Sequence, residues 1–223
     1  MAGPSSHWQD TDGSLCPRKL ELATANMAPV RDALIETMLL DEEQFRRRLP
    51  DLVETHQLRT VGPDHAEDSP ADIIRSLDGF ETSSVTSFER EYIAKMVRLG
   101  TGPLGLTLTG PAYQDNPVRY ATQTFQEMTG YSLATLRGEN LRLLQGPATD
   151  PEAVATLQEG VDIWERRTVE LWNYRADGTR FRNRVTIVPL SGPDGSITNW
   201  LGVQKAIDTA DGSLLVAQSA DTS

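Results

Sequence analysis

The sequence of 223 residues is poor in the side chains that usually form metal sites and disulfides, with one cysteine and three histidines. The single cysteine, Cys16, excludes an intramolecular disulfide and any cysteine-rich metal site. The histidines lie at positions 7, 56 and 65 without ligand spacing. No stretch approaches the ~18 consecutive apolar residues of a membrane span, and the first residues lack a signal-peptide pattern. We therefore expect a cytoplasmic protein without a metal site.

Lysine is also scarce: only three of the 21 basic residues are lysines, and the formal net charge is -11. An acidic, lysine-poor surface stays hydrated in concentrated salt, so a halophilic cell is one interpretation and an ordinary acidic protein is the alternative. A negative chain repels nucleic acid and anionic lipid. The one basic run, 46–48, is flanked by acidic residues. We expect neither nucleic acid nor membrane as a direct partner.

The first half of the chain predicts a disordered start and a helical extension. Residues 1–28 are rich in Gly, Pro, Ser and Asp, which favours disorder. Apolar residues at helical spacing predict helices over 29–59, with Pro50 in the first turn of a further helix, and Pro70 opens another. The clearest helix is 86–99, where Thr86 and Glu89 form a capping box. It either carries a signal or only covers a sheet.

The second half, 101–207, predicts a compact α+β domain. Strands at 104–109 and 118–121 precede two short helices near 125 and 133, and an amphipathic helix follows Pro151. Three long strands then finish the domain, joined by turns at Asp177-Gly178 and 192–195. The tail from 208 to 223 is small and polar.

The stretch from Gly138 to Gly146 has the composition of a ligand-pocket wall. It offers two amides, an arginine and three apolar side chains between two glycines. An arginine grips a phosphate through several donors at once, while Asn and Gln both donate and accept.

This stretch resembles the flavin-binding signature of light-oxygen-voltage (LOV) domains, a branch of the PAS family. There, a glycine, an asparagine, a cysteine, an arginine and a Leu-Gln-Gly follow one another. The segment 115–117 and the residues Tyr120, Phe125 and 129–131 match the family in order and spacing. The resemblance covers about 104–207. It implies an α+β PAS/LOV domain with a five-stranded antiparallel sheet and flanking helices, which follows the helical N-terminal extension that apolar spacing predicts at 29–100.

The resemblance also implies a flavin, with FMN expected and riboflavin or FAD left open. Arg142 corresponds to the phosphate ligand, Asn140 and Gln145 to ribityl contacts, Asn173 and Asn183 to partners of the pyrimidine edge, and Gln204 to the residue facing N5 and O4. Gln158 stands where a second arginine often holds the phosphate, which weakens that clasp. The expected pocket residues are Thr107, Thr109, Asn140, Leu141, Arg142, Gln145, Gln158, Asn173, Asn183, Val185 and Gln204.

Leu141 stands at the position of the family's adduct-forming cysteine, and it has no nucleophile. The function that remains is a blue-light photoreceptor or flavin redox sensor, working by photoreduction to the neutral semiquinone and reorientation of Gln204. Output is expected through the N-terminal helices, by altered homodimerisation or by binding of a downstream protein. The expected electron donors are Tyr120, Tyr131, Trp172, Tyr174 and Trp200, with no order among them.

The alternative is a PAS scaffold for constitutive dimerisation, with a structural flavin or none. A yellow protein favours the sensor and a colourless one favours the scaffold. An enzyme is not expected, because no His, Cys or paired carboxylates gather in the predicted pocket.

Overall fold

The computed structural model describes residues 28–56, 58, 68–77, 85–99, 102–192 and 194–207. The disorder expected over 1–28 falls outside these ranges except for Ala28, which begins the first helix, and the polar tail at 208–223 falls outside them entirely. Within the described ranges, no helix combines the length and apolarity needed to cross a membrane.

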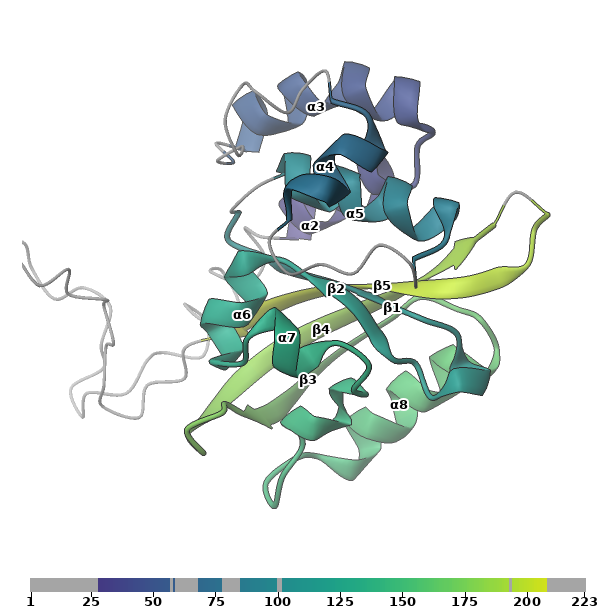
Figure 1. Cartoon of the computed structure of the whole chain (residues 1–223). Helices are drawn as coiled ribbons and strands as arrows, with labels where there is room; N and C mark the ends of the chain where they lie inside the picture. Colours follow the sequence, from purple (N-terminus) through teal and green to yellow (C-terminus); the bar gives the residue numbers. More distant parts are fainter. Residues whose placement is uncertain are drawn as a thin grey trace, which may run out of the picture.

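A five-stranded antiparallel sheet forms the centre of the molecule, as the sequence predicts (Figure 1). Its strands lie in the order β2-β1-β5-β4-β3. They are β1 (Gly105–Thr109), β2 (Val118–Ala121), β3 (Arg167–Tyr174), β4 (Arg180–Ser191) and β5 (Ile197–Ile207). Successive side chains point to opposite faces, so each strand contributes to both sides of the sheet.

One strand runs further than expected. The sequence predicts that the fourth strand stops before Pro189, yet β4 continues to Ser191 and Pro189 pairs with Trp200 of β5. On its other side β4 pairs with β3, and the last pair of that ladder is Arg167 with Ile187, two residues before Pro189. Proline lacks a backbone donor and is tolerated at an edge, and here the ladder on that side has already ended.

One face of the sheet carries short helices and a cavity. Its covering elements are α6 (Gln123–Thr129), α7 (Leu133–Leu136), the 3-10 turn η4 (Leu141–Leu144) and α8 (Pro151–Asp162). A further 3-10 turn, η3 (Ala112–Gln114), connects β1 to β2. Gly105 touches Phe125 of α6 so closely that an added Cβ would lie 3.0 Å from its Cα. We call this side of the sheet the cavity face.

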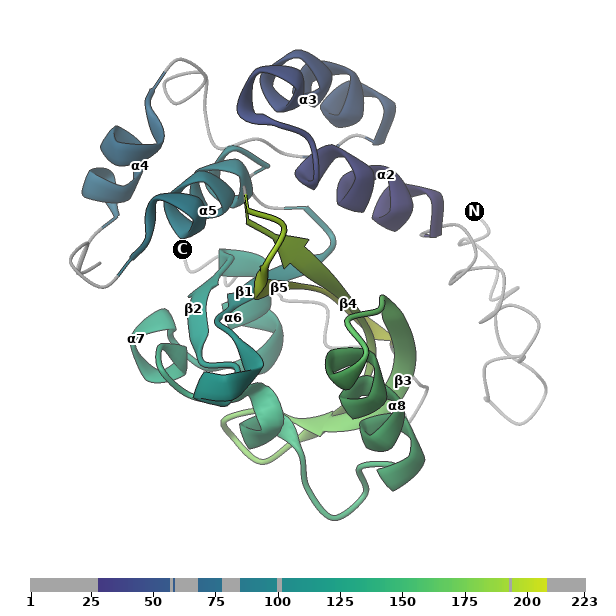
Figure 2. The same ribbon diagram turned by 90° about the vertical axis from the view of Figure 1, so that its right-hand side faces the viewer.

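The opposite face is covered by the N-terminal helices, which we call the helical cap (Figures 1 and 2). The cap comprises α2 (Ala28–Met38), α3 (Glu42–His56), α4 (Pro70–Ser76) and α5 (Ser87–Leu99). Cap side chains such as Ile93 and Met96 share one buried core with Leu106, Leu201 and Val203 of the sheet. Burial of apolar surface therefore holds cap and sheet together.

The N-terminal caps of α4 and α5 are those predicted from the sequence, whereas the predicted role of Pro50 is wrong. In α5 the Glu89 backbone N–H donates to Thr86 Oγ1 at 3.1 Å, and the Thr86 N–H donates to Glu89 Oε2 at 2.9 Å. Ser69 caps α4 at the expected Pro70 start. Pro50, expected to start a new helix, instead lies within the continuous helix α3. The buried side chains Phe45 and Leu52, one on each side of Pro50, anchor both halves of α3 in the core.

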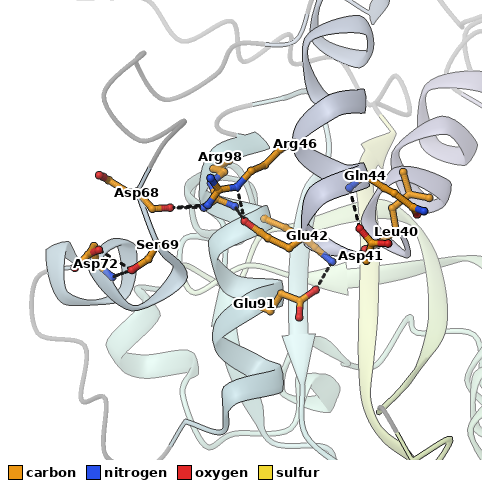
Figure 3. A network of polar contacts seen from close by, with 11 residues as sticks. Leu40, Asp41, Glu42, Gln44, Arg46, Asp68, Ser69, Asp72, Glu91 and Arg98 are labelled. Atoms are coloured by element: carbon orange, nitrogen blue, oxygen red, sulfur yellow. Dashed lines mark hydrogen bonds and ion pairs between the residues drawn. The ribbon is translucent and has the colours of Figure 1, made fainter.

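Buried charges join the helices of the cap (Figure 3). The Arg98 guanidinium pairs with Glu42 of α3 and donates to the Asp68 carbonyl at 2.6 Å. Arg46 contacts the same two groups, at 2.8 and 3.0 Å. Lys95, which is 1% exposed, donates to the Leu40 carbonyl at 2.6 Å. Arg98 and Lys95 are thus desolvated and compensated by oxygens from other segments, whereas the Arg46 side chain stays 36% exposed.

Replacing Arg98 tests this arrangement. Arg98→Ala removes the charge-assisted hydrogen bonds of a buried guanidinium while Arg46 still pairs with Glu42, so we expect it to lower the free energy of unfolding by about 2 kcal/mol. Arg47→Ala is the control, because Arg47 and Glu43 form a pair with side chains 75% and 85% exposed, and its cost is expected to stay below about 1 kcal/mol. Urea titration of the full chain measures both, and equal losses would contradict the argument.

Candidate functional site

A cavity of about 230 Å³ lies between the cavity face of the sheet and the segment containing η4 and α8. Its volume is just below the roughly 300–1,000 Å³ of typical small-molecule sites. It is lined by Thr107, Thr109, Asn116, Asn140, Leu141, Arg142, Leu144, Gln145, Val154, Leu157, Gln158, Val161, Leu171, Asn173, Val185, Ile187, Trp200, Gly202 and Gln204. Ten of the eleven residues predicted from the sequence are in this set.

The eleventh, Asn183, is fully buried behind the cavity wall, where it joins two amides that do line it. Its Nδ2 donates to Asn173 Oδ1 and to Gln204 Oε1, each at 2.9 Å. Gln204 Nε2 in turn donates to Thr107 Oγ1 at 3.4 Å. Asn173 Nδ2 donates to the Leu144 carbonyl at 3.2 Å. We call Asn173, Asn183 and Gln204 the amide relay.

The strand register builds the amide relay. Val185 of β4 pairs directly with Gln204 of β5, and Asn183 lies two residues further along the same face. Asn183 also pairs with Leu171 of β3, two residues before Asn173. Diagonal neighbours on one face of a sheet are close enough for long side chains to meet. Three amides from three adjacent strands are therefore in contact.

Two carboxamide oxygens at the site lack a hydrogen-bond partner within the described structure. They are Asn183 Oδ1 and Asn116 Oδ1, and both are buried. A buried acceptor without a donor costs about 1–3 kcal/mol. Asn116 lines the cavity and Asn183 lies behind its wall, so on the Asn116 side an amide acceptor without a donor among the described residues borders the cavity.

The remaining wall is apolar and was only partly evident from the sequence. Val154, Leu157 and Val161 form one stripe of α8, and their helical spacing was recognised, but not the direction in which the stripe faces. Leu144, Leu171, Ile187, Trp200, Gly202 and Asn116 were not among the expected pocket residues. Strand alternation does place Ile187 on one face with Asn183 and Val185, and the same reasoning could have placed Leu171 beside Asn173.

At the rim, the predicted phosphate ligand already has a partner. Arg142 donates through both terminal nitrogens to the Asp115 carboxylate, at 2.8 and 2.6 Å. Asn140 Nδ2 donates to the Asp115 carbonyl at 2.6 Å. Gln158 Nε2 donates to Asp162 at 2.8 Å. Among the described residues that line the cavity, only Arg142 is formally charged, and it pairs with the Asp115 carboxylate.

The structure also ranks the aromatic residues proposed as electron donors. Trp200 lines the cavity, and the other four do not. Tyr120 belongs to the core shared with the helical cap, where burial raises the pKa of its phenol to about 12. Trp172 lies under the guanidinium of Arg180, 4.7 Å from the ring centroid.

A family model described as a PAS domain matches residues 107–207. A LOV-domain structure titled "Flavin Analogue Sheds Light on Light-Oxygen-Voltage Domain Mechanism" is 42% identical, covering 47% of this chain and 77% of that one, with a TM-score of 0.45. The LOV domain of the Erythrobacter litoralis EL346 histidine kinase is 35% identical, covering 49% of this chain and 100% of that one, with a TM-score of 0.47. The chain belongs to the LOV branch of the PAS family.

Curated relatives agree with this LOV assignment. "Blue-light-activated histidine kinase 1" of Erythrobacter litoralis is 41% identical over 101 residues, 45% of this chain and 28% of that protein. "Blue-light photoreceptor" of Listeria monocytogenes is 35% identical over 119 residues, 53% of this chain and 46% of that protein. The match thus spans less than half of either relative.

Gly202, which lines the LOV cavity, has no space for a side chain. A Cβ at this position would lie 2.3 Å from Thr107 Oγ1 and 3.4 Å from Gln204 Nε2. Overpacking of this kind costs typically 1–3 kcal/mol, so Gly202→Ala is expected to lower the free energy of unfolding by about 2 kcal/mol.

Gly102→Ala is the matched control, because a Cβ there meets its nearest atom at 3.5 Å. Denaturant titration of both variants measures the difference. The packing argument fails if Gly202→Ala is as stable as Gly102→Ala.

Proposed function

We propose that the cavity binds a flavin and that the chain senses blue light or redox state without forming a cysteine–flavin adduct. The observation that carries this is the amide relay beside an apolar slot. A uracil-like ring edge alternates acceptor, donor and acceptor, and carboxamides meet all three without burying a charge. FMN is the flavin that family membership implies.

The donor set of the chain fits such a ring. Asn173 and Gln204 bring amide groups to the cavity, and Asn116, another lining residue, has an amide oxygen without a donor among the described residues. Val154, Leu157 and Ile187 supply the apolar contacts that a planar aromatic system needs. Trp200 is the candidate electron donor, because its side chain lines the same wall.

A bound flavin would supply absorption of blue light and uptake of one electron and one proton. Leu141 lies on the cavity wall where the family places its reactive cysteine, and the single cysteine of the sequence is Cys16. A leucine offers no sulfur for a covalent bond. Signalling in this chain therefore relies on hydrogen bonds alone.

Rotation of the Gln204 amide would reverse the donor and acceptor roles in every hydrogen bond of the amide relay. Asn183 donates to Gln204 Oε1, so turning the Gln204 amide would bring two donors together. Asn183 must then turn as well, which presents its oxygen to Asn173 Oδ1, and Asn173 must follow. Thr107 tolerates either polarity, because a hydroxyl both donates and accepts. The reversal ends at the Leu144 carbonyl, where Asn173 loses an acceptor.

Glu89 offers a route from the sheet to the helical cap. This buried carboxylate of α5 accepts from Asn199 Nδ2 of β5 at 3.1 Å and forms an ion pair with Arg119 of β2 at 3.1 Å. Asn199 also donates to the Thr109 carbonyl, and Thr109 lines the cavity. A change in β5 therefore reaches α5 through charged hydrogen bonds, which supports output through the cap and its binding to a second copy or another protein.

The function is tested with the purified full chain. We expect a structured blue absorption band that bleaches reversibly under blue light with added reductant, together with a light-dependent change in self-association measured by light scattering. Gln204→Leu should abolish the change in association while the flavin stays bound, because leucine cannot reverse a hydrogen bond. Gln123→Leu, at an exposed position, should leave it intact. A colourless protein that takes up no flavin would favour the scaffold.

Glu89→Gln tests the output route. Hydrogen bonds to charged groups contribute about 1.5–3 kcal/mol, so we expect amide protons of α5 to exchange roughly 30-fold faster in the dark and to lose their light dependence. Glu127→Gln, at an exposed position of α6, is the control. Hydrogen exchange read by mass spectrometry distinguishes the two, and unchanged exchange in Glu89→Gln would contradict the route.

A further inference from the structure

We propose that the C-terminal end of α8 docks onto the sheet of a second copy of this chain, so that copies associate head to tail. The contact joins two different surfaces. One is an exposed apolar pair at the end of α8 with the acidic side of that helix, and the other is a basic surface on β3 and β4. The inference does not depend on a bound flavin.

The apolar pair consists of Ile163 and Trp164, which we call the docking tip. Their side chains are 49% and 64% exposed. Among the described residues, the other large hydrophobic side chains with such exposure are Leu39 and Tyr113, which are isolated in the sequence. Tryptophan is one of the residue types that contribute most to binding at protein interfaces.

The backbone at Trp164 has a conformation that disfavours tryptophan. Its φ is 57°, and the N–H of the next residue, Glu165, donates to the Gly160 carbonyl at 2.9 Å. This is the hydrogen bond of a Schellman helix end, whose left-handed residue is usually glycine. A side chain there costs stability, so the presence of Trp164 indicates a role outside the fold of a single copy.

The outer side of α8 carries negative charge as far as the docking tip. Glu152, Glu159 and Asp162 are exposed, and the helix contains no Lys or Arg. The last carbonyl groups of a helix add a partial negative charge. The arginines that follow, at 166 and 167, each pair with a carboxylate. A surface that receives the docking tip should therefore be basic.

A basic surface lies on the side of the sheet opposite the cavity. The helical cap covers the aliphatic part of that side, and polar residues of β3, β4 and β5 follow beyond it. Directly paired residues of an antiparallel ladder point to one face. Although the formal net charge of the chain is -11, the described strands place four cations here against one carboxylate, Glu170: Arg180, Arg182, Arg184 and Lys205.

Trp172, Arg180 and Arg182, which we call the platform, form the receiving surface. The two guanidinium carbons lie 4.7 and 5.9 Å from the centroid of the Trp172 ring. Within the described ranges neither guanidinium pairs with a carboxylate, whereas neighbouring Arg184 donates to Glu170 at 2.7 Å. The platform thus offers charged donors beside an aromatic ring, which complements the carboxylates and apolar side chains at the end of α8.

Because the two surfaces differ, the contact is heterologous, and each copy keeps one docking tip and one platform for further copies. The surfaces are small, and interfaces of small area are weak. Their charged groups lie at the surface, where salt screens them. We therefore expect an association that grows with protein concentration and is lost at high salt.

Sedimentation velocity of the full chain in the dark tests the contact. The sedimentation coefficient should rise with protein concentration at about 0.05 M salt and stay constant at about 0.5 M salt. Trp164→Gly should weaken the association about tenfold or more. The same change should raise the melting temperature by about 2–4 °C, because glycine relieves the left-handed position. Lost association in this variant is then not a sign of misfolding.

The platform is tested by the double variant Arg180→Glu with Arg182→Glu, which should weaken the association to a similar extent, because like charges then face each other. Tyr113→Ala is the control, since it removes an aromatic side chain that is 83% exposed in η3, away from both surfaces. It should associate as the native chain does. Circular dichroism and the melting temperature confirm that the double variant is folded.

Mixing the two variants distinguishes a head-to-tail contact from any other. Trp164→Gly retains its platform and the double variant retains its docking tip, so an equimolar mixture should form one-to-one pairs and nothing larger. The proposal is overturned if the native chain stays monomeric at low salt or if Trp164→Gly associates as the native chain does. It is also overturned if the mixture stays as dissociated as its components.

Discussion

The hydrogen bonds that Asn183 donates to Asn173 and Gln204 join three neighbouring strands of the sheet and require these strands to keep one register. The three amides come from three adjacent strands, they are buried, and each depends on the next for a partner. A shift of any one of these strands by one residue would turn its amide to the other face and break the chain of hydrogen bonds. Gly202 belongs to the same constraint, since only a missing side chain leaves room for Thr107 beside Gln204.

The sheet separates two kinds of environment. Its cavity face presents amides, hydroxyls and a narrow apolar slot, whereas its other face presents aliphatic side chains to the helical cap. Because β5 supplies Gln204 to one side and Val203 to the other, a displacement of this strand acts on both. Glu89 adds a polar link near the beginning of this strand, and the buried side chains of Arg98 and Lys95 join the helices of the cap to one another.

The local elements were predictable because their signals are short in sequence. The capping box at Thr86 and Glu89, the Pro70 start and the Asp177-Gly178 turn depend on neighbours a few residues apart. Contacts between residues that are far apart in the sequence could not be predicted. The position of Asn183 behind the wall follows from register, the direction of the α8 stripe follows from packing, and the partner of Arg142 lies 27 residues away. Pro50 was misplaced because burial of both flanks of α3 outweighs the local tendency of proline to break a helix.

The role of the amide relay in binding is tested most directly by nuclear magnetic resonance of side-chain amides in the ¹⁵N-labelled full chain. If the relay forms the floor of a flavin site, adding flavin shifts the side-chain NH₂ signals of Gln204, Asn183 and Asn173. The Asn199 signal, from the amide bonded to Glu89, should move far less in the dark. Relay signals that stay in place while flavin is bound would contradict the account.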